Sequence, residues 1–237
     1  MPMETVAQLH SQIGLYDPQV NDRLTYFHDA RNGVAAAKSS LRNLGDVICR
    51  HQIHEFVGVC LLHKHFDLKY SERLVRIVDM NQATSTPREA GFEHCVPFSW
   101  KLDPSSDRSV DTFRPLEFFV AAESSGAARR VAELSSTLVG MHEFWYDIAA
   151  VFRQLELQDV LGLSILNQQF LEKQPDEAFL ETTNDRNRVL TLRPAPKSAV
   201  ERPSIIETQW LFSPGETADG ACTHCSHMGC NGHCFHS

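Results

Sequence analysis

Hydrophobic residues near the start of the chain recur three and four positions apart, which is the spacing of an amphipathic helix. Asp17 followed by Pro18 is a helix-start signal, because it places a capping side chain before a proline at the first helical position. Gly33 and Gly45 interrupt the pattern, so we expect two helices here, after a short helix over residues 4–13. The apolar positions of this region are Val20, Leu24, Phe27, Val34, Leu41, Leu44 and Ile48.

The strongest helical pattern lies in the middle of the chain and predicts one long central helix over residues 131–155. Phe144 and Val151 widen its apolar face beyond the narrow stripe of a coiled coil, so it should pack against a sheet or against the N-terminal helices. Its seam consists of Val131, Leu134, Leu138, Met141, Trp145, Ile148, Phe152 and Leu155.

Short runs rich in β-branched and aromatic residues predict strands on both sides of that helix. The run over residues 56–66 is apolar on both faces and has no proline, which is typical of a central strand. Residues 81–90 are polar and are expected to form a loop. Residues 184–187 are expected to form a hairpin loop. The other predicted strands are 74–78, 91–102, 112–122, 162–166, 178–183, 188–192 and 205–212.

This order of elements predicts an α+β fold with a mostly antiparallel sheet, N-terminal helices and one long central helix. A Ser-Pro-Gly break at 213–215 separates a single domain, residues 1–212, from a Cys/His-rich tail, residues 213–237.

Composition narrows the function classes. The net charge of −8 is unfavourable for binding a polyanion, and 42% hydrophobic residues allow a large core. No apolar run reaches the roughly 20 residues that span a bilayer, and the N-terminus lacks a secretory pattern, so we expect a cytoplasmic protein without a membrane partner. Dinucleotide, P-loop and serine-hydrolase motifs are absent from the sequence.

The tail gathers four of the seven cysteines of the chain: Cys222, Cys225, Cys230 and Cys234. An odd cysteine count and a reducing compartment favour metal over disulfides, and this spacing suits one tetrahedral zinc, with His233 as an alternative ligand. The pattern resembles a zinc knuckle, but a cysteine replaces the knuckle histidine and the last gap is one residue shorter. We therefore carry over the metal and not the nucleic-acid binding.

A second histidine cluster lies near the predicted central strand. His63 and His65 are two apart, so on a strand they share one face, and His51 and His54 precede them beside Glu55. The pair could hold a metal of unassigned identity, with Glu55 as a nearby carboxylate. They could also be core histidines, each satisfied by a backbone carbonyl.

The segment Glu55-Phe-Val-Gly-Val-Cys-Leu-Leu-His-Lys-His-Phe-Asp-Leu68, with Trp210-Leu-Phe212 and the tail, resembles a group of small fungal proteins of secondary metabolism. The arginine-containing cyclodipeptide synthases, which use aminoacyl-tRNA, are one such family. This chain lacks the Asp-Asp-x-x-Glu motif associated with them, so no catalytic residue is transferred.

Three functions are therefore open. The first is an enzyme of fungal small-molecule biosynthesis with a zinc-binding tail and a pocket containing His63, His65 and Glu55. The second is a tRNA-dependent, peptide-bond-forming transferase, and the third is a non-catalytic zinc-binding interaction protein. A concave pocket with converging carboxylates favours the first. A basic groove favours the second, and it would consist of Arg186, Arg188, Arg193, Lys197 and Arg202.

Overall fold

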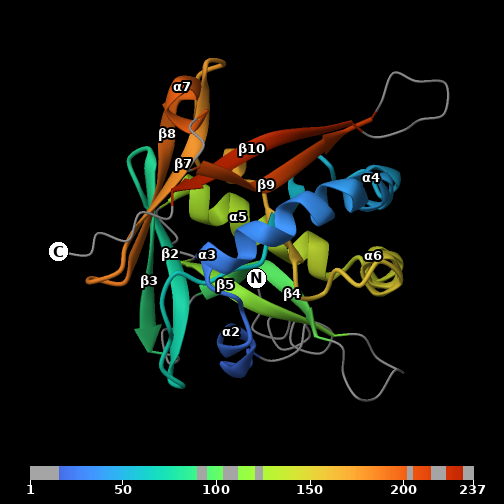
Figure 1. The fold of residues 1–237 in the computed structure, drawn as a ribbon, viewed down its shortest axis with the longest axis horizontal. Coiled ribbons are helices and arrows are strands. Elements are labelled where there is room, and N and C mark those ends of the chain that lie inside the picture. The colour runs from blue at the N-terminus through green and yellow to red at the C-terminus, as the bar shows by residue number, and fades with distance from the viewer. Residues whose placement is uncertain are drawn as a thin grey trace.

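The structure is a computed structural model that describes residues 16–89, 95–103, 112–120, 125–201, 205–214 and 223–231. For residues 35–37, 112 and 223–231 it describes the backbone alone. The expected α+β class with a mostly antiparallel sheet is confirmed (Figure 1). The expected helix at residues 4–13 lies outside the described residues.

The described strands close into a barrel in the order β1-β6-β4-β5-β2-β3-β8-β7-β10-β9. Neighbouring strands are antiparallel, except that β2 is parallel to β5 and β7 is parallel to β10. The strands are β1 (Val57–Leu61), β2 (Glu72–Asp79), β3 (Gln82–Glu89), β4 (Cys95–Asp103), β5 (Thr112–Val120), β6 (Leu161–Ile165), β7 (Glu177–Asn184), β8 (Val189–Pro196), β9 (Ile205–Ser213) and β10 (Thr223–Asn231).

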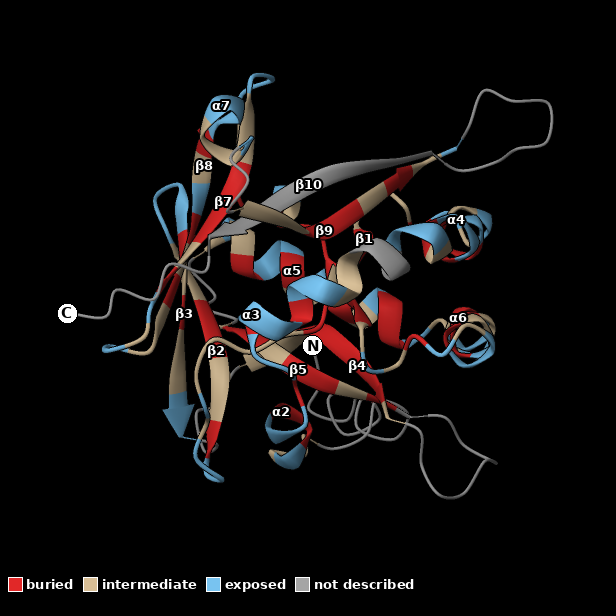
Figure 2. Cartoon of the chain, in the orientation of Figure 1, coloured by how far each residue is buried: buried red, intermediate tan, exposed pale blue. Residues whose placement is uncertain are grey.

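Helices pack on one part of this barrel. The longest, α4 (Val34–Arg50), packs on β1, β9 and β10 and also contacts α6 (His142–Gln154), while α5 (Gly126–Val139) packs on β4, β5 and β6. Their inner faces and the strands beneath them form a continuous buried core (Figure 2). The short helices are α2 (Gln19–Asp22), α3 (Phe27–Ala30), η1 (Arg31–Gly33), η2 (Asn167–Gln169) and α7 (Lys197–Val200).

The predicted long central helix is wrong, because the chain breaks between α5 and α6. Gly140 ends α5, and Met141 leaves the helical region with φ −90° and ψ 69°. The Trp145 indole N–H then donates to the Leu138 carbonyl, which also accepts from the Met141 amide, and so links the start of α6 to the end of α5. The apolar spacing continues across the break, so it could not reveal that two helices share the seam.

Gly45 does not interrupt its helix, contrary to prediction. It lies within α4, and a Cβ atom there would come 2.4 Å from Cδ1 of Phe212 on β9. Glycine at this position therefore allows the helix to approach the barrel closely.

The predicted loop at residues 81–90 is also wrong. Residues 82–89 form β3, which pairs with β2 through a hairpin turn at Met80–Asn81. Met80 has a positive φ of 51°. The polar side chains of β3 reflect a strand with few fully buried positions rather than a loop. The predicted turn between β7 and β8 is confirmed.

The predicted central strand is shorter than residues 56–66. β1 covers Val57–Leu61 and pairs with β6 on one side and β9 on the other, so its central position is confirmed. Beyond Leu61 the chain no longer pairs with β6 and β9 as a strand. Lys64 instead forms an isolated parallel β-bridge with Tyr26, near the N-terminal helices. None of the described helices is long and apolar enough to cross a membrane.

Candidate metal centre in the barrel

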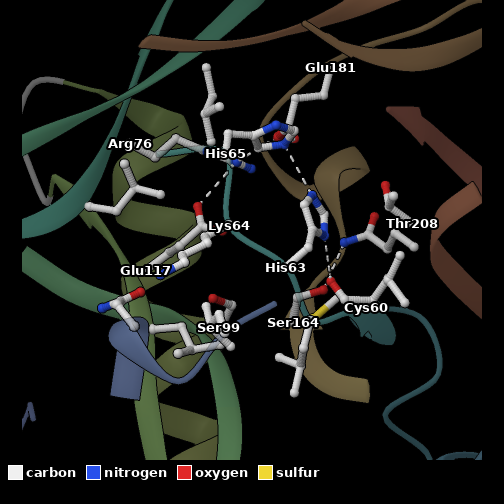
Figure 3. Close-up of a pocket in the computed structure, with 18 of the residues that line it drawn as sticks. Cys60, His63, Lys64, His65, Arg76, Ser99, Glu117, Ser164, Glu181 and Thr208 are labelled. Carbon is white, nitrogen blue, oxygen red and sulfur yellow. Dashed lines mark hydrogen bonds and ion pairs between the residues drawn. The ribbon is translucent and has the colours of Figure 1, made fainter. Parts of the chain in front are cut away.

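A cavity of about 80 Å³ opens among β1, β2, β4, β5, β6, β7, β9 and the connection that follows β1. On this measure one water needs roughly 10–15 Å³, so the cavity can hold several waters or part of a small molecule. Part of its lining is leucine and phenylalanine, and the rest is a dense set of polar side chains (Figure 3). Such a cavity, mostly preformed and containing convergent polar groups, is the usual form of a small-molecule site.

Two of the polar side chains are His63 and His65, which lie on the connection directly after β1. The amide of Leu62 still donates to the Val160 carbonyl, whereas Lys64 exchanges backbone hydrogen bonds with Thr25 and Phe27. This crossing from the barrel to the N-terminal segment holds the connection at the cavity, where both imidazole rings line the wall.

The third member of the cluster is Glu181 on β7. The Nε2 atoms of His63 and His65 are 3.1 Å apart, and Nε2 of His65 is 3.4 Å from Oε1 of Glu181. One donor atom from each of the three residues can be chosen so that all lie within 4.8 Å of one another. Ligands about 2.0–2.1 Å from one zinc-sized ion, at angles between octahedral and tetrahedral, are separated by roughly 2.9–3.4 Å. The two distances that involve Nε2 of His65 match this range.

The opposite ring nitrogens are held by other groups. Nδ1 of His63 is 2.9 Å from the Leu61 carbonyl oxygen, which can only accept, so this nitrogen carries the proton in neutral His63. Nδ1 of His65 is 2.8 Å from the Thr183 hydroxyl. Metal-binding histidines commonly have their second nitrogen fixed in this way. The Nε2 lone pair of His63 therefore points at His65 and needs a cation or a proton between the two rings.

Arg76 of β2 lies beside this cluster and joins two carboxylates, one buried (Glu181) and one partly buried (Glu117). Its Nη2 is 3.5 Å from Oε2 of Glu181 and 3.2 Å from Oε2 of Glu117 on β5. Its Nε donates to the Ser85 hydroxyl at 2.8 Å, and the guanidinium lies 4.7 Å from the centre of the Phe98 ring. The planar fork of arginine suits such shared pairing.

Burial and these neighbouring charges shift the pKa values of the clustered side chains in different directions. Burial, together with the charge of His65, lowers the pKa of His63 to about 4. Burial by itself would raise the pKa of Glu181, but the His65 hydrogen bond and the charges of His65 and Arg76 lower it to about 2. Burial raises the pKa of Glu117 against the opposing effect of Arg76. Glu181 is thus a carboxylate at neutral pH, and His63 is a neutral imidazole whose Nε2 lone pair faces His65.

A series of hydrogen-bonded side chains lines one part of the cavity. Asn167 of η2 accepts from Arg76 at 3.4 Å and donates to Oε1 of Gln209 at 3.0 Å. Gln209 of β9 donates in turn to the Ser164 hydroxyl on β6 at 2.8 Å. Because each of these side chains is buried and bonded, the wall around the cluster is rigid.

Sequence reasoning located two of the three clustered residues. Glu55 lies apart from the cluster: its side chain is exposed ahead of β1, and its carbonyl accepts from Gln169. His51 also lies elsewhere, with its Nε2 2.9 Å from Asp147 of α6. Glu181 was missed, although a lone carboxylate alternating with Phe179 and Thr183 on one strand face was a usable signal.

The predicted zinc ligands of the tail belong to parts of the chain whose side chains the structure does not describe. Cys225 and Cys230 lie on β10, for which the backbone alone is described, while Cys222, His233 and Cys234 lie outside the described residues. The tail zinc stays a prediction. The backbone of β10 pairs with β9 and β7 and so completes the barrel.

The predicted basic groove is described in part. Arg186, Arg193 and Lys197 are exposed on or next to the β7–β8 hairpin. Arg188 is paired with Glu72 at the barrel rim, and Arg202 lies outside the described residues.

Comparison with protein-family models, curated proteins and solved structures finds no match to this chain.

Proposed function

We propose that this chain is an enzyme of small-molecule biosynthesis whose centre is a divalent transition metal bound by His63, His65 and Glu181. The observation that carries the proposal is the convergence of two imidazole nitrogens and a carboxylate oxygen within 4.8 Å inside a cavity. Three protein ligands leave further positions open for water or substrate, which is typical of catalytic rather than structural sites.

The ligand set favours zinc, iron or another first-row metal over calcium or magnesium, which prefer oxygen donors. A metal of this kind polarises a substrate oxygen or makes bound water acidic. The chain's own residues supply the rest: the Leu61 carbonyl and Thr183 orient the rings, and Arg76 holds Glu181.

Glu117 is placed for proton transfer at the same centre. Nη2 of Arg76 contacts both Glu117 and Glu181, so the two carboxylates lie close together. Because the pKa of Glu117 is raised, this carboxyl group titrates closer to neutral pH than an ordinary glutamate, whereas Glu181 stays ionised. Two carboxyl groups with separated acidities are a common arrangement for one ligand and one acid–base group.

The test is the metal content of purified protein by elemental analysis. The predicted tail zinc would add to the count, so the measurement uses the full chain carrying Cys225→Ser and Cys230→Ser. In this background we expect about one tightly bound metal per chain. His63→Gln, His65→Gln and Glu181→Gln should each abolish it, because each removes one of three ligands.

His51→Gln is the matched control, because His51 belongs to the same stretch of sequence but contacts Asp147 outside the cavity. It should keep the metal. The proposal is wrong if the three cavity variants fold, as judged by circular dichroism, and retain as much metal as His51→Gln.

A further inference from the structure

The lining of the cavity that contains His63, His65 and Glu181 also includes a hydroxyl for which the described residues offer no hydrogen-bond partner. Oγ of Ser99 on β4 is buried, and the structure shows no hydrogen-bond partner for it among the described residues. Ser99 as a whole is 4% exposed. A buried hydroxyl that is not hydrogen-bonded costs free energy, so its presence calls for a reason.

Strand register shows where this hydroxyl points. Ser99 pairs with Glu117 of β5 on one side and with Ser164 of β6 on the other. Directly paired residues of antiparallel strands project to the same face, and both Glu117 and Ser164 line the cavity. Ser99 therefore faces the cavity between them (Figure 3).

The strand is irregular at this point. The register of β4 against β5 shifts on both sides of Ser99, which is the signature of a bulge. The irregularity lets the neighbours Phe98 and Ser99 both line the cavity, although regular alternation would send them to opposite faces. Bulges commonly re-aim a side chain next to a functional site.

The cations that line the cavity are already paired. Arg76 is held by Glu117, Glu181, Ser85 and Asn167, as described above. Nζ of Lys64 is 2.8 Å from Asp67 and also donates to the Asp22 carbonyl. In the metal-free cavity an anionic ligand would have to displace one of these partners, whereas an uncharged ligand need not.

Much of the remaining lining is apolar. Side chains of Leu24, Leu62, Leu74, Phe98, Leu116 and Leu190 surround the polar groups. This surface favours a ligand with an apolar body that presents one oxygen to the polar wall.

We infer that Ser99 is a specificity-determining residue that donates a hydrogen bond to an oxygen of an uncharged, partly apolar small-molecule substrate. The inference rests on the proposed function for its substrate role. Ser99 lies outside the metal-ligand set, so its variant should leave metal binding unchanged. Ser164, in contrast, is already bonded to Gln209 and is a less independent test.

The experiment compares benzamide with benzoate, two probes of nearly equal shape that differ in charge, by saturation-transfer NMR on chelator-treated protein, so that a carboxylate cannot bind a metal ion directly. We expect benzamide to bind more tightly than benzoate. Ser99→Ala should weaken benzamide about 3- to 10-fold, the effect of one neutral hydrogen bond. Its melting temperature should stay the same or rise, since the variant removes an unpaired buried hydroxyl.

Ser135→Ala is the control, because Ser135 is equally buried but donates to the Pro97 carbonyl away from the cavity. It should leave benzamide affinity unchanged. This inference is overturned if benzoate binds as tightly as benzamide, or if Ser99→Ala leaves the affinity for benzamide unchanged. Neither result bears on the metal content, which tests the proposed function. The metal hypothesis is tested separately, by elemental analysis. Its failure leaves the benzamide comparison unaffected, because that comparison uses chelator-treated protein.

Discussion

Ser99 and Trp100 are neighbours on β4, yet they belong to two different regions of the molecule. Trp100 is fully buried in the apolar layer between barrel and helices, with its ring centre 5.7 Å from that of Trp145 on α6. Ser99 faces the polar cavity. One region gains stability from apolar burial, whereas the other buries ionised groups that cost free energy unless they are paired. We therefore expect stability and ligand binding to separate by mutation.

The largest expected effect is loss of stability in the apolar layer. Phe152→Ala removes a fully buried ring on α6 that packs edge-on against Phe113. Substitutions of this kind cost about 3–5 kcal/mol. Chemical denaturation should show this loss, while the protein that remains folded keeps the metal that we propose for the cavity. Loss of metal from well-folded Phe152→Ala would show that the two regions are coupled.

The next effect concerns pH and belongs to the cavity. In chelator-treated protein the folded-state pKa of His63 is about 4, below its ordinary value of 6.5. Between these values the unfolded chain binds the proton more readily, so stability falls as pH decreases from about 6.5 to 4. Glu181, with its pKa lowered from 4.5 to about 2, removes further stability as pH falls through that lower range.

His63→Gln should flatten the upper part of this pH dependence, and denaturation midpoints measured from pH 4 to 7 would show it. His51→Gln serves as the comparison, since that ring is outside the cavity. An unchanged slope in His63→Gln would mean that another group causes the pH dependence.

The two regions also differ in how well the sequence predicts them. Apolar spacing located the seam of α5 and α6 and most strands, because burial of one face imposes a period. It failed at Gly45 and Gly140, where one glycine fits a close contact inside a helix and the other ends a helix. Both outcomes depend on tertiary neighbours that a local pattern does not contain.

The cavity was harder to predict. His63 and His65 stand out because they are two apart, but their partner Glu181 is more than a hundred residues away. Only closure of the barrel brings β7 to the connection after β1. Glu55, the carboxylate nearest in sequence, is exposed instead. Proximity along the chain was therefore a poor guide to which carboxylate joins the histidines.

A smaller effect is expected from the group that orients His65. Thr183→Val keeps the size of the side chain but removes the hydroxyl 2.8 Å from Nδ1 of His65. Loss of such an orienting partner typically weakens metal binding about 10- to 100-fold. Competition with a chelating dye, in the background lacking Cys225 and Cys230, would measure it. Thr182→Val is the control, because that hydroxyl bonds to the Thr191 carbonyl on the neighbouring strand. Equal affinities in both variants would argue against metal binding through His65.

The smallest expected effect tests how tightly the apolar layer is packed. In Gly45→Ala the new methyl group would lie 2.4 Å from Cδ1 of Phe212, which is itself buried, so helix or ring must shift. Overpacking costs about 1–3 kcal/mol, but alanine regains about 1 kcal/mol of helix propensity over glycine, which leaves a net loss of about 1 kcal/mol.

Gly126→Ala at the start of α5 is the matched variant, because nothing lies within 4 Å of the added Cβ. It should be neutral or slightly stabilising in the same denaturation experiment. If Gly45→Ala were as stable as Gly126→Ala, α4 would have room to move on the barrel. The layer that supports the cavity would then be less rigid than the contact between Gly45 and Phe212 indicates.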